Sequence, residues 1–240
     1  MTRSALITGA GSGIGLAIAH VLGEEGYDLT VAALDDDDLP RATAELRGRG
    51  FAVLDVAVDV ADEAQICGLV ATHEERYGRL DVLVSNAGVG IGGPVERTTT
   101  DRLDRQLAVN LRAPVLLLRE AVHLLRAAAA EHREALVVST ASLAGVIGEP
   151  MLGVYAATKG GLIAWTESMH RELSGEGIRS TALCPGFVDT PMTDFVKDRI
   201  DPGTMMLPQD LAEAVRFLLR TSPMCSVPQL HLVGTGHARR

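Results

Sequence analysis

Ser4-Ala5-Leu6-Ile7-Thr8-Gly9-Ala10-Gly11-Ser12-Gly13-Ile14-Gly15 joins an apolar run to a loop with glycine at every second position. The apolar run predicts a buried strand over 4–8, and the apolar stripe that follows predicts a helix over 14–25. Such glycines allow a tight turn and let backbone N–H groups approach a pyrophosphate, which the helix dipole also attracts. No Gly-Lys-Ser/Thr follows, unlike in the loops of nucleotide hydrolases. We therefore expect a dinucleotide site; the alternative is a glycine-rich turn without a ligand.

Apolar runs and amphipathic stretches alternate along the whole chain, which predicts an α/β fold. Strands are predicted at 4–8, 29–33, 51–58, 82–85, 135–139, 180–183 and 230–233. Helices are predicted at 14–25, 39–49, 62–77, 101–131, 154–173 and 208–221, with Asp62 as an N-cap and a bend near Pro114. This alternation indicates a doubly wound (Rossmann) seven-stranded parallel sheet, covered on both faces, in a single domain over 1–240. Ligands of such folds bind outside the carboxyl ends of the strands.

Composition narrows the classes of function. The chain has 240 residues, 47% of them apolar, and a formal net charge of -9 without a basic run. That charge argues against a nucleic acid and against an anionic membrane surface as partners. The N-terminal segment is too short for a signal peptide, and no apolar run reaches the roughly 20 residues of a membrane span. Cys67, Cys184 and Cys225 lack metal-ligand spacing, so we expect no metal site and free thiols in a reducing cytoplasm.

Tyr155 and Lys159 lie four residues apart near the start of a predicted helix, so they share one face. A free phenol has a pKa of about 10 and is a poor proton donor or acceptor at neutral pH. A neighbouring ammonium favours the phenolate and lowers that pKa toward the working range. The spacing alone is typical of a surface pair. Its meaning depends on whether a cofactor loop and further polar groups converge on the same sheet edge.

Six motifs follow one another along the chain: Thr8-Gly9-x-x-x-Gly13-Ile14-Gly15, Asn86-Ala87-Gly88, Asn110, Ser142, Tyr155-x-x-x-Lys159 and Pro185-Gly186. In this order and spacing they resemble the short-chain dehydrogenase/reductase family. The resemblance runs from residue 4 to about residue 233, and the ordered set is far more specific than any single motif. It implies an NAD(P)-dependent oxidoreductase that transfers a hydride between the nicotinamide and a secondary alcohol or ketone.

The resemblance also implies a catalytic set. Tyr155 would be the general acid for ketone reduction and the base for alcohol oxidation. Lys159 would lower the pKa of that phenol and bind the nicotinamide ribose. Ser142 would bond the substrate oxygen, and the alternatives for that role are Ser139 and Thr140. Asn110 would hold a water that links the lysine to solvent, or would serve only as a core amide.

The expected cofactor contacts span five sheet-edge loops and the helix predicted at 154–173. They are Gly9, Gly11, Ser12, Gly13, Ile14, Gly15, Asp35, Asp59, Val60, Asn86, Ala87, Gly88, Tyr155, Lys159, Pro185, Gly186, Val188 and Thr190. Asp59 would contact the adenine, the alternative being a loop-capping carboxylate. Thr190 would bond the nicotinamide carboxamide, and Val188 would add a backbone contact to the same group.

The choice between NAD and NADP is a question of charge. A 2′-phosphate needs a basic partner, usually in the glycine loop or just after the second strand. The loop offers Ser12, and the strand ends Ala33-Leu34-Asp35-Asp36 with no Arg or Lys nearby, so we expect NAD rather than NADP. The family's NAD-selecting aspartate aligns with Ala33. Either Asp35 reaches the ribose, or the acidic run is only a solvated turn.

The substrate pocket is expected from Leu143, Val146, Ile147, Met151, Leu152 and segment 192–207. Segment 189–207 mixes Pro, Gly and uneven polarity, which predicts a mobile substrate lid. Its Met192, Phe195, Met205 and Met206 favour an apolar substrate, or they pack within their own loop. Two cations of the lid that would suit an acidic carrier group are Lys197 and Arg199.

Three functions remain open. The leading one is an alcohol dehydrogenase or carbonyl reductase acting on a small molecule. The second is a non-catalytic NAD(H)-sensing regulator on the same fold, and the third is an epimerase or dehydratase, whose relatives usually carry a further C-terminal domain. A homodimer or homotetramer is the family expectation, with dimerisation through the helices predicted at 101–131 and 154–173.

Overall fold

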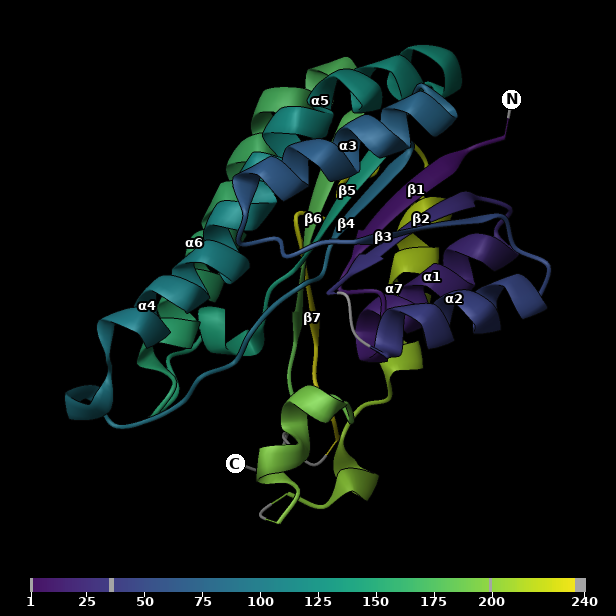
Figure 1. Cartoon of the computed structure of the whole chain (residues 1–240). Coiled ribbons are helices and arrows are strands. Elements are labelled where there is room, and N and C mark those ends of the chain that lie inside the picture. Colours follow the sequence, from purple (N-terminus) through teal and green to yellow (C-terminus); the bar gives the residue numbers. More distant parts are fainter. Residues whose placement is uncertain (1, 35–36, 199, 236–240) are drawn as a thin grey trace.

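The computed structural model describes residues 2–34, 37–198 and 200–235, and within them the expected parallel sheet is confirmed (Figure 1). The 7-stranded sheet has the order β3-β2-β1-β4-β5-β6-β7, and every neighbouring pair is parallel. The strands are β1 (Ser4–Thr8), β2 (Asp28–Ala33), β3 (Val53–Ala57), β4 (Val82–Ser85), β5 (Ala135–Thr140), β6 (Ile178–Pro185) and β7 (Gln229–Leu232). Strands β2 and β3 are added on one side of β1, and β4 to β7 are added on its other side, so the order of strands reverses between β1 and β4. Sheets of this kind bind ligands at that switch point.

Helices cover both faces of the sheet (Figure 1). They are α1 (Gly13–Glu24), α2 (Asp38–Gly48), α3 (Glu63–Tyr77), α4 (Thr100–Leu107), α5 (Ala113–His132), α6 (Gly153–Leu173) and α7 (Pro208–Arg220). α1, α2 and α7 lie on one side, and α3, α5 and α6 lie on the other. Strand β1 shows why two faces are needed: Leu6 packs into the cluster under α3 and α5, whereas Ala5 and Ile7 pack into the cluster under α1 and α7. Side chains alternate across a strand, so both faces of this sheet must be apolar.

The prediction of one continuous helix over 101–131 is wrong in its middle. α4 ends at Leu107, the π-helical turn η2 (Ala108–Arg112) follows, and α5 begins at Ala113. Pro114 supplies a physical reason, because it lacks the N–H that an α-helix would donate to the carbonyl of Asn110. A π turn absorbs this break without ending the helical rod, and it places Asn110 inside the fold.

Smaller boundary differences do not alter the architecture. β3 is shorter than expected and β6 is longer, running on to Pro185. The predicted N-cap is confirmed, since Asp62 accepts the N–H of Ala64 at 2.8 Å. Over residues 2–34, 37–198 and 200–235, no helix combines the length and apolar character that a membrane crossing requires.

Candidate functional site

The loop between β1 and α1 has the shape expected of a pyrophosphate cradle. Gly9 and Gly13 have φ angles of 65° and 55°, in the left-handed region that favours glycine. A Cβ at Gly15 would collide with the Gly9 carbonyl oxygen and lie 2.6 Å from Asn86 Nδ2. The loop is therefore a tight, bare backbone turn at the N-terminus of α1, where the first N–H groups have no partner within the helix. These residues fit a dinucleotide cofactor.

A chain of hydrogen bonds runs from this loop along the carboxyl edge of the sheet. Asn86 Nδ2 donates to the Gly9 carbonyl at 3.0 Å, and Asn86 Oδ1 accepts from Thr140 Oγ1 at 3.1 Å. The carbonyl of Thr140 accepts from Lys159 Nζ at 2.6 Å. We call this set of four residues the edge chain. It links the phosphate loop to the Tyr155 helix through β4 and β5.

Ser142, Tyr155 and Lys159 converge at the end of β5, as the sequence motifs predict. Ser142 caps the short turn η3 (Leu143–Gly145) by accepting the Ala144 N–H at 3.1 Å, and its side chain acts to lower the pKa of the Tyr155 phenol. The Lys159 ammonium lies 5.8 Å from the centre of the Tyr155 ring. Of the alternatives to Ser142, Ser139 is fully buried and Thr140 already donates to Asn86.

Burial dominates the protonation of this group. It raises the pKa of the Tyr155 phenol above its ordinary 10.0, although the hydrogen bond with Ser142 acts in the opposite direction. It also lowers the pKa of the Lys159 ammonium to about 8. The expected lowering of the phenol pKa by Lys159 is therefore not found in this state of the protein. Desolvation outweighs the attraction between the two groups.

Asn110 sits in the π turn with its side chain wholly buried. Its Oδ1 accepts the Val89 N–H at 2.8 Å, and its Nδ2 donates to the Val89 carbonyl at 2.9 Å and to Thr158 Oγ1 at 3.2 Å. A Cβ on Gly88 would lie 3.5 Å from both Asn110 Oδ1 and Lys159 Nζ. Asn110 thus fixes the loop after β4 beside Lys159. Its side chain has the partners of a core amide, and it also lies near the lysine that it is predicted to link to solvent.

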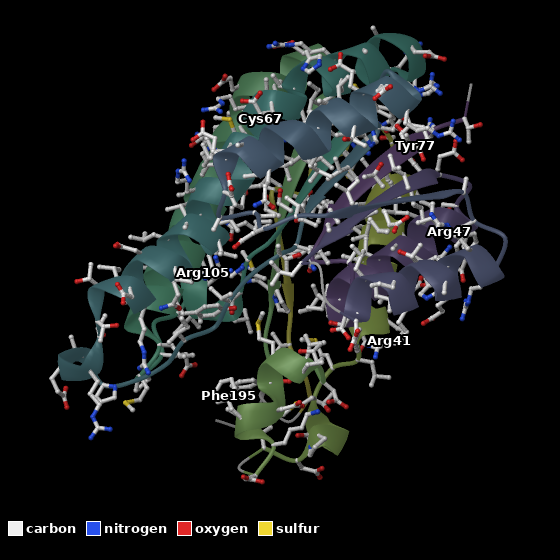
Figure 2. All side chains as sticks on the ribbon, viewed as in Figure 1. Arg41, Arg47, Cys67, Tyr77, Arg105 and Phe195 are labelled. Carbon is white, nitrogen blue, oxygen red and sulfur yellow. The ribbon has the colours of Figure 1, made fainter. Side chains whose placement is uncertain are left out.

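A small cavity lies under the end of β4, lined among others by Val60, Ala87 and Val109. Asp59 lies beside it and is held by Arg105 of α4, with 3.0 Å between Arg105 Nη1 and Asp59 Oδ2 (Figure 2). Burial acts to raise the pKa of this carboxyl. The hydrogen bonds from the Ala61 N–H and from Arg105 outweigh that effect and hold the pKa below its usual value. Arg105 carries no motif and was not predicted.

The ribose side differs from the expectation. Asp35 lies outside the described residues, so its predicted contact stays a prediction. Asp38, the first residue of α2, lies closer than expected: its Cβ would be 3.1 Å from a Cβ on Gly11. Arg41 donates to Asp38 Oδ1 at 2.6 Å (Figure 2). The prediction that no Arg or Lys lies near the end of β2 is therefore wrong. The first residue of α2 therefore lies beside the glycine loop, with Arg41 bonded to it.

The segment after β6 reaches toward the same loop. The Gly186 N–H donates to the Leu232 carbonyl, which anchors the Pro185-Gly186 turn to β7. Val188 pairs with Met206 in an isolated bridge. The Thr190 Cγ2 methyl lies 3.2 Å from where a Cβ on Gly13 would be. The residues predicted for the nicotinamide half therefore meet the phosphate loop.

Segment 189–207 contains two short 3-10 turns, η5 (Pro191–Val196) and η6 (Pro202–Thr204). Its apolar side chains divide into two groups. Met192 and Phe195 are 46% and 65% exposed (Figure 2), whereas Met205 and Met206 are buried, so the latter pair packs within the fold rather than facing a substrate. Lys197 forms ion pairs with Asp189 and Asp194, each at 2.7 Å, so an acidic carrier group would compete with these two carboxylates for it. Arg199 lies outside the described residues.

Across the site from Met192, the loop after β4 comes close to the Tyr155 ring. A Cβ on Gly90 would lie 4.0 Å from both the Met192 Sδ and the Tyr155 Cε2. A Cβ on Gly92 would lie 3.2 Å from Leu152 Cδ2. These glycines were not predicted because they belong to no motif, yet they set the space beside the phenol.

Comparison with known proteins agrees with this geometry. The model of the short chain dehydrogenase family matches residues 3–201. The chain is 33% identical over 230 residues to a 3-oxoacyl-(acyl-carrier-protein) reductase of Staphylococcus aureus, covering 91% of each chain. A 3-ketoacyl-(acyl-carrier-protein) reductase of Brucella melitensis complexed with NADH superposes with a TM-score of 0.88 at 32% identity, covering 97% of each chain. An actinorhodin polyketide ketoreductase with NADPH superposes with a TM-score of 0.90 at 30% identity, covering 100% of this chain and 98% of that one.

Proposed function

The chain belongs to the short-chain dehydrogenase/reductase family, and from that premise we propose that Ser142, Tyr155 and Lys159 carry its proton transfer. It is a nicotinamide-dependent oxidoreductase that moves a hydride between the cofactor and a secondary alcohol or ketone. The observation that supports the residue assignment is the placement of the buried Lys159 ammonium 5.8 Å from the centre of the Tyr155 ring, with Ser142 acting on the same phenol.

The chemistry divides between cofactor and protein. When bound, the nicotinamide supplies or accepts the hydride. In the reductive direction, the Tyr155 hydroxyl donates its proton to the substrate oxygen as the carbonyl carbon gains the hydride, and the product is the alcohol. Ser142 bonds the same oxygen and holds it in line with the phenol. The raised pKa of Tyr155 keeps this proton in place until the oxygen develops negative charge.

Lys159 and Asn110 position the proton donor. Lys159 is fixed by the Thr140 carbonyl, and Asn110 fixes Val89 and Thr158 on either side of it. We propose that the lysine binds the nicotinamide ribose and returns the proton to Tyr155 through that group. Asn110 would keep the lysine in contact with solvent through a water on the side of Gly88.

Tyr155→Phe tests the assignment. We expect a loss of about 100- to 10,000-fold in kcat for ketone reduction, because this is the range that general acid catalysis contributes. The dissociation constant for NADH, measured by the fluorescence of the cofactor, should stay within threefold of the wild type. Full turnover by the variant would refute the role of the phenol. Cofactor binding without turnover of any ketone by the wild type would instead favour a sensor of the NAD/NADH ratio.

We propose NAD as the preferred cofactor, with Asp38 as the selecting carboxylate in place of the aspartate aligned with Ala33. Asp38 is near Gly11 and would accept from a ribose 2′-hydroxyl, and its charge would repel a 2′-phosphate. Arg41 is the competing feature, because a freed guanidinium would attract that phosphate. We expect the wild type to prefer NAD at least tenfold in kcat/KM, and Asp38→Asn to remove most of that preference. A wild type that prefers NADP and loses this preference on Arg41→Ala would reverse the assignment.

The substrate proposed is a ketone on an apolar chain. Ile147 and Met151, in the loop between Ser142 and Tyr155, are 67% and 56% exposed, and Met192, which shares the surroundings of Gly90 with the Tyr155 ring, and Phe195 are exposed apolar side chains as well. The relatives named above act on 3-oxoacyl groups, which fit this class. We expect 3-oxoacyl thioesters of N-acetylcysteamine and medium-chain ketones to be reduced with kcat/KM at least tenfold above that for a polyol oxidised in reverse. A preference for the polyol would contradict the proposal.

Three further proposals concern the whole molecule. Segment 189–207 acts as a lid, which hydrogen exchange should report as slower exchange when NADH and a substrate analogue are both present. The chain forms a homodimer or homotetramer through α5 and α6, which sedimentation equilibrium measures directly. The three cysteines, each free in the structure, fit a cytoplasmic location, and fluorescence microscopy of a tagged chain tests it.

A further inference from the structure

Gln106 is buried on helix α4, most of which is exposed. The residue is 1% exposed, whereas the other residues of this helix are exposed or half-buried. Its Oε1 accepts the Ile91 N–H at 3.2 Å, and its Nε2 donates to the Arg102 carbonyl at 3.4 Å. A buried amide costs free energy unless it is bonded, and an apolar side chain would fill the same place without a partner. The bond to Ile91 is therefore what the amide adds to this helix.

Gln106 and Asn110 together hold the loop after β4. They lie one helical turn apart on the rod formed by α4 and η2, so they share a face. Asn110 Oδ1 accepts the Val89 N–H at 2.8 Å, and Gln106 Oε1 accepts the N–H two residues further along, at Ile91. Successive residues of an extended chain point to opposite sides, so Gly90, between the two bonded residues, faces away from α4 and toward the site.

The Gly90 backbone closes one flank of the Tyr155 phenol. A Cβ on Gly90 would lie 4.0 Å from Tyr155 Cε2, the ring carbon next to the one that bears the hydroxyl. The Gly90 Cα is therefore at most about 5.5 Å from this ring carbon, because a single carbon–carbon bond is about 1.5 Å long. A carbon atom between them would need about 7 Å, which is two contacts of about 3.5 Å each. No substrate group fits there, so this backbone is a pocket wall beside the reacting oxygen.

The stretch of loop that forms this wall is flexible by composition, because both neighbours of Ile91 are glycines. Glycine has more backbone freedom than any other residue. Beyond this stretch, the Gly93 N–H donates to the Met151 carbonyl at 2.7 Å. Without the bond to Gln106, the loop would be held through the bonds on either side of the stretch, and the wall would move more freely.

We propose that Gln106 sets the width of the substrate pocket by holding Ile91, and thereby restricts the enzyme to ketones that are unbranched next to the carbonyl. This proposal rests on the proposed function, because it takes Tyr155 as the group that meets the substrate oxygen. Gln106 is a positioning residue for the pocket wall and takes no part in hydride or proton transfer. One methylene more or less in an apolar pocket changes kcat/KM by about 10- to 200-fold, so a fixed wall is enough for this selectivity.

Amide hydrogen exchange of the full chain, followed by NMR, tests the hold on the loop without turnover. We expect Gln106→Met, which keeps the length of the side chain but loses the acceptor, to speed exchange of the Ile91 N–H at least about tenfold. The N–H groups of Val89 and Gly93 should keep their rates within threefold, since their acceptors are untouched. Leu103→Met is the matched control, because Leu103 is exposed on the same helix, and it should leave all three rates within twofold of the wild type.

Kinetics with two isomeric ketones tests the consequence for the substrate. The compound 2-hexanone is unbranched next to the carbonyl, whereas its isomer pinacolone carries a tert-butyl group there. The wild type should reduce 2-hexanone at least about tenfold better in kcat/KM, and Gln106→Met should lower this ratio below threefold by decreasing the KM for pinacolone. The kcat for 2-hexanone should stay within threefold, which a general loss of structure would not allow. Gln106→Glu keeps an acceptor oxygen for the Ile91 N–H and should restore a ratio of at least about fivefold.

The two measurements separate this proposal from the function on which it rests. Unchanged exchange at Ile91 in Gln106→Met, or an unchanged ratio between the two ketones, would overturn the role of Gln106. A wild type that reduces both ketones equally well would overturn it too. A wild type that reduces no ketone would instead refute the proposed function, and the exchange rates would still decide whether Gln106 holds the loop.

Discussion

Replacing Gly145 with alanine tests whether the position of Ser142 depends on the contact between η3 and α6. A Cβ at Gly145 would lie 2.6 Å from the Lys159 carbonyl carbon and 2.7 Å from the Gly160 nitrogen. Both are backbone atoms of a helix, so neither rotates away as a flexible side chain would. To reach an ordinary contact at 3.4 Å, η3 must move away from α6 by about 0.8 Å. Ser142 begins η3, so its hydroxyl moves with this turn away from Tyr155.

We expect kcat of Gly145→Ala to fall about 10- to 100-fold, because displacements near 1 Å cost up to about 100-fold where catalysis depends on positioning. The free energy of unfolding should fall by about 1–3 kcal/mol, the usual result of overpacking. The Kd for NADH should change less than threefold, since the glycine loop lies elsewhere on the sheet edge. Steady-state kinetics, urea unfolding and cofactor fluorescence measure the three quantities.

Gly148→Ala is the matched control in the same loop. A Cβ at Gly148 meets no atom within 4 Å, so this variant should keep kcat within twofold of the wild type. Unchanged kcat in Gly145→Ala would refute the dependence of Ser142 on this contact. An equal loss in Gly148→Ala would show that any added methyl in the loop disturbs the site.

Further predictions concern protonation and the glycine loop. Burial lowers the pKa of Lys159 from 10.5 to about 8, so the unfolded chain binds more protons than the folded chain between these pH values. The free energy of unfolding should therefore rise with pH in this range by up to about 3 kcal/mol. Lys159→Met should lack this rise in urea titrations at pH 8 to 10. Burial lowers the pKa of His73 from 6.5 to about 4, so stability present above pH 6.5 should be lost as pH falls through 4, by up to about 3 kcal/mol, and His73→Gln should flatten that acid limb. Gly15→Ala should weaken NADH binding at least tenfold by fluorescence titration, because its Cβ would collide with the Gly9 carbonyl; Gly68→Ala on α3, with no atom within 4 Å, should keep the affinity and gain about 0.5–1 kcal/mol of stability.

The sequence predicted the sheet and the convergence of the catalytic motifs for the same reason. Each strand is a short apolar run, and the glycine loop, Asn86-Ala87-Gly88, Ser142 and Pro185-Gly186 each lie at or just after the end of one, so a parallel arrangement brings these motifs to one edge. Ser142 and Tyr155 meet because one follows β5 and the other begins α6. Neither conclusion required knowledge of distant contacts.

Other features depend on depth or on long-range contacts that a local pattern does not contain. The spacing of Tyr155 and Lys159 says that they share a helix face, but their burial reverses the expected direction of the phenol pKa. Arg105 reaches Asp59 across 46 residues of chain, and no periodicity in α4 marks it. The π turn was not predicted because its residues continue the helical pattern of the segments on either side. Its cause is a single missing N–H at Pro114.

The edge chain from Gly9 to Lys159 separates this protein into a part that tolerates little change and a part that is open to exchange. Three consecutive hydrogen bonds hold the proton-transfer group in register with the phosphate loop, and the four residues they join come from the sheet edge and the helix beside it. Met192 and Phe195, by contrast, lie exposed on a segment that makes none of these links. We therefore expect that exchanging residues 191–207 between relatives, with Thr190 left in place, changes the substrate range while the reaction chemistry stays in the recipient. Libraries for new ketones belong in that segment, and the edge chain should be left intact.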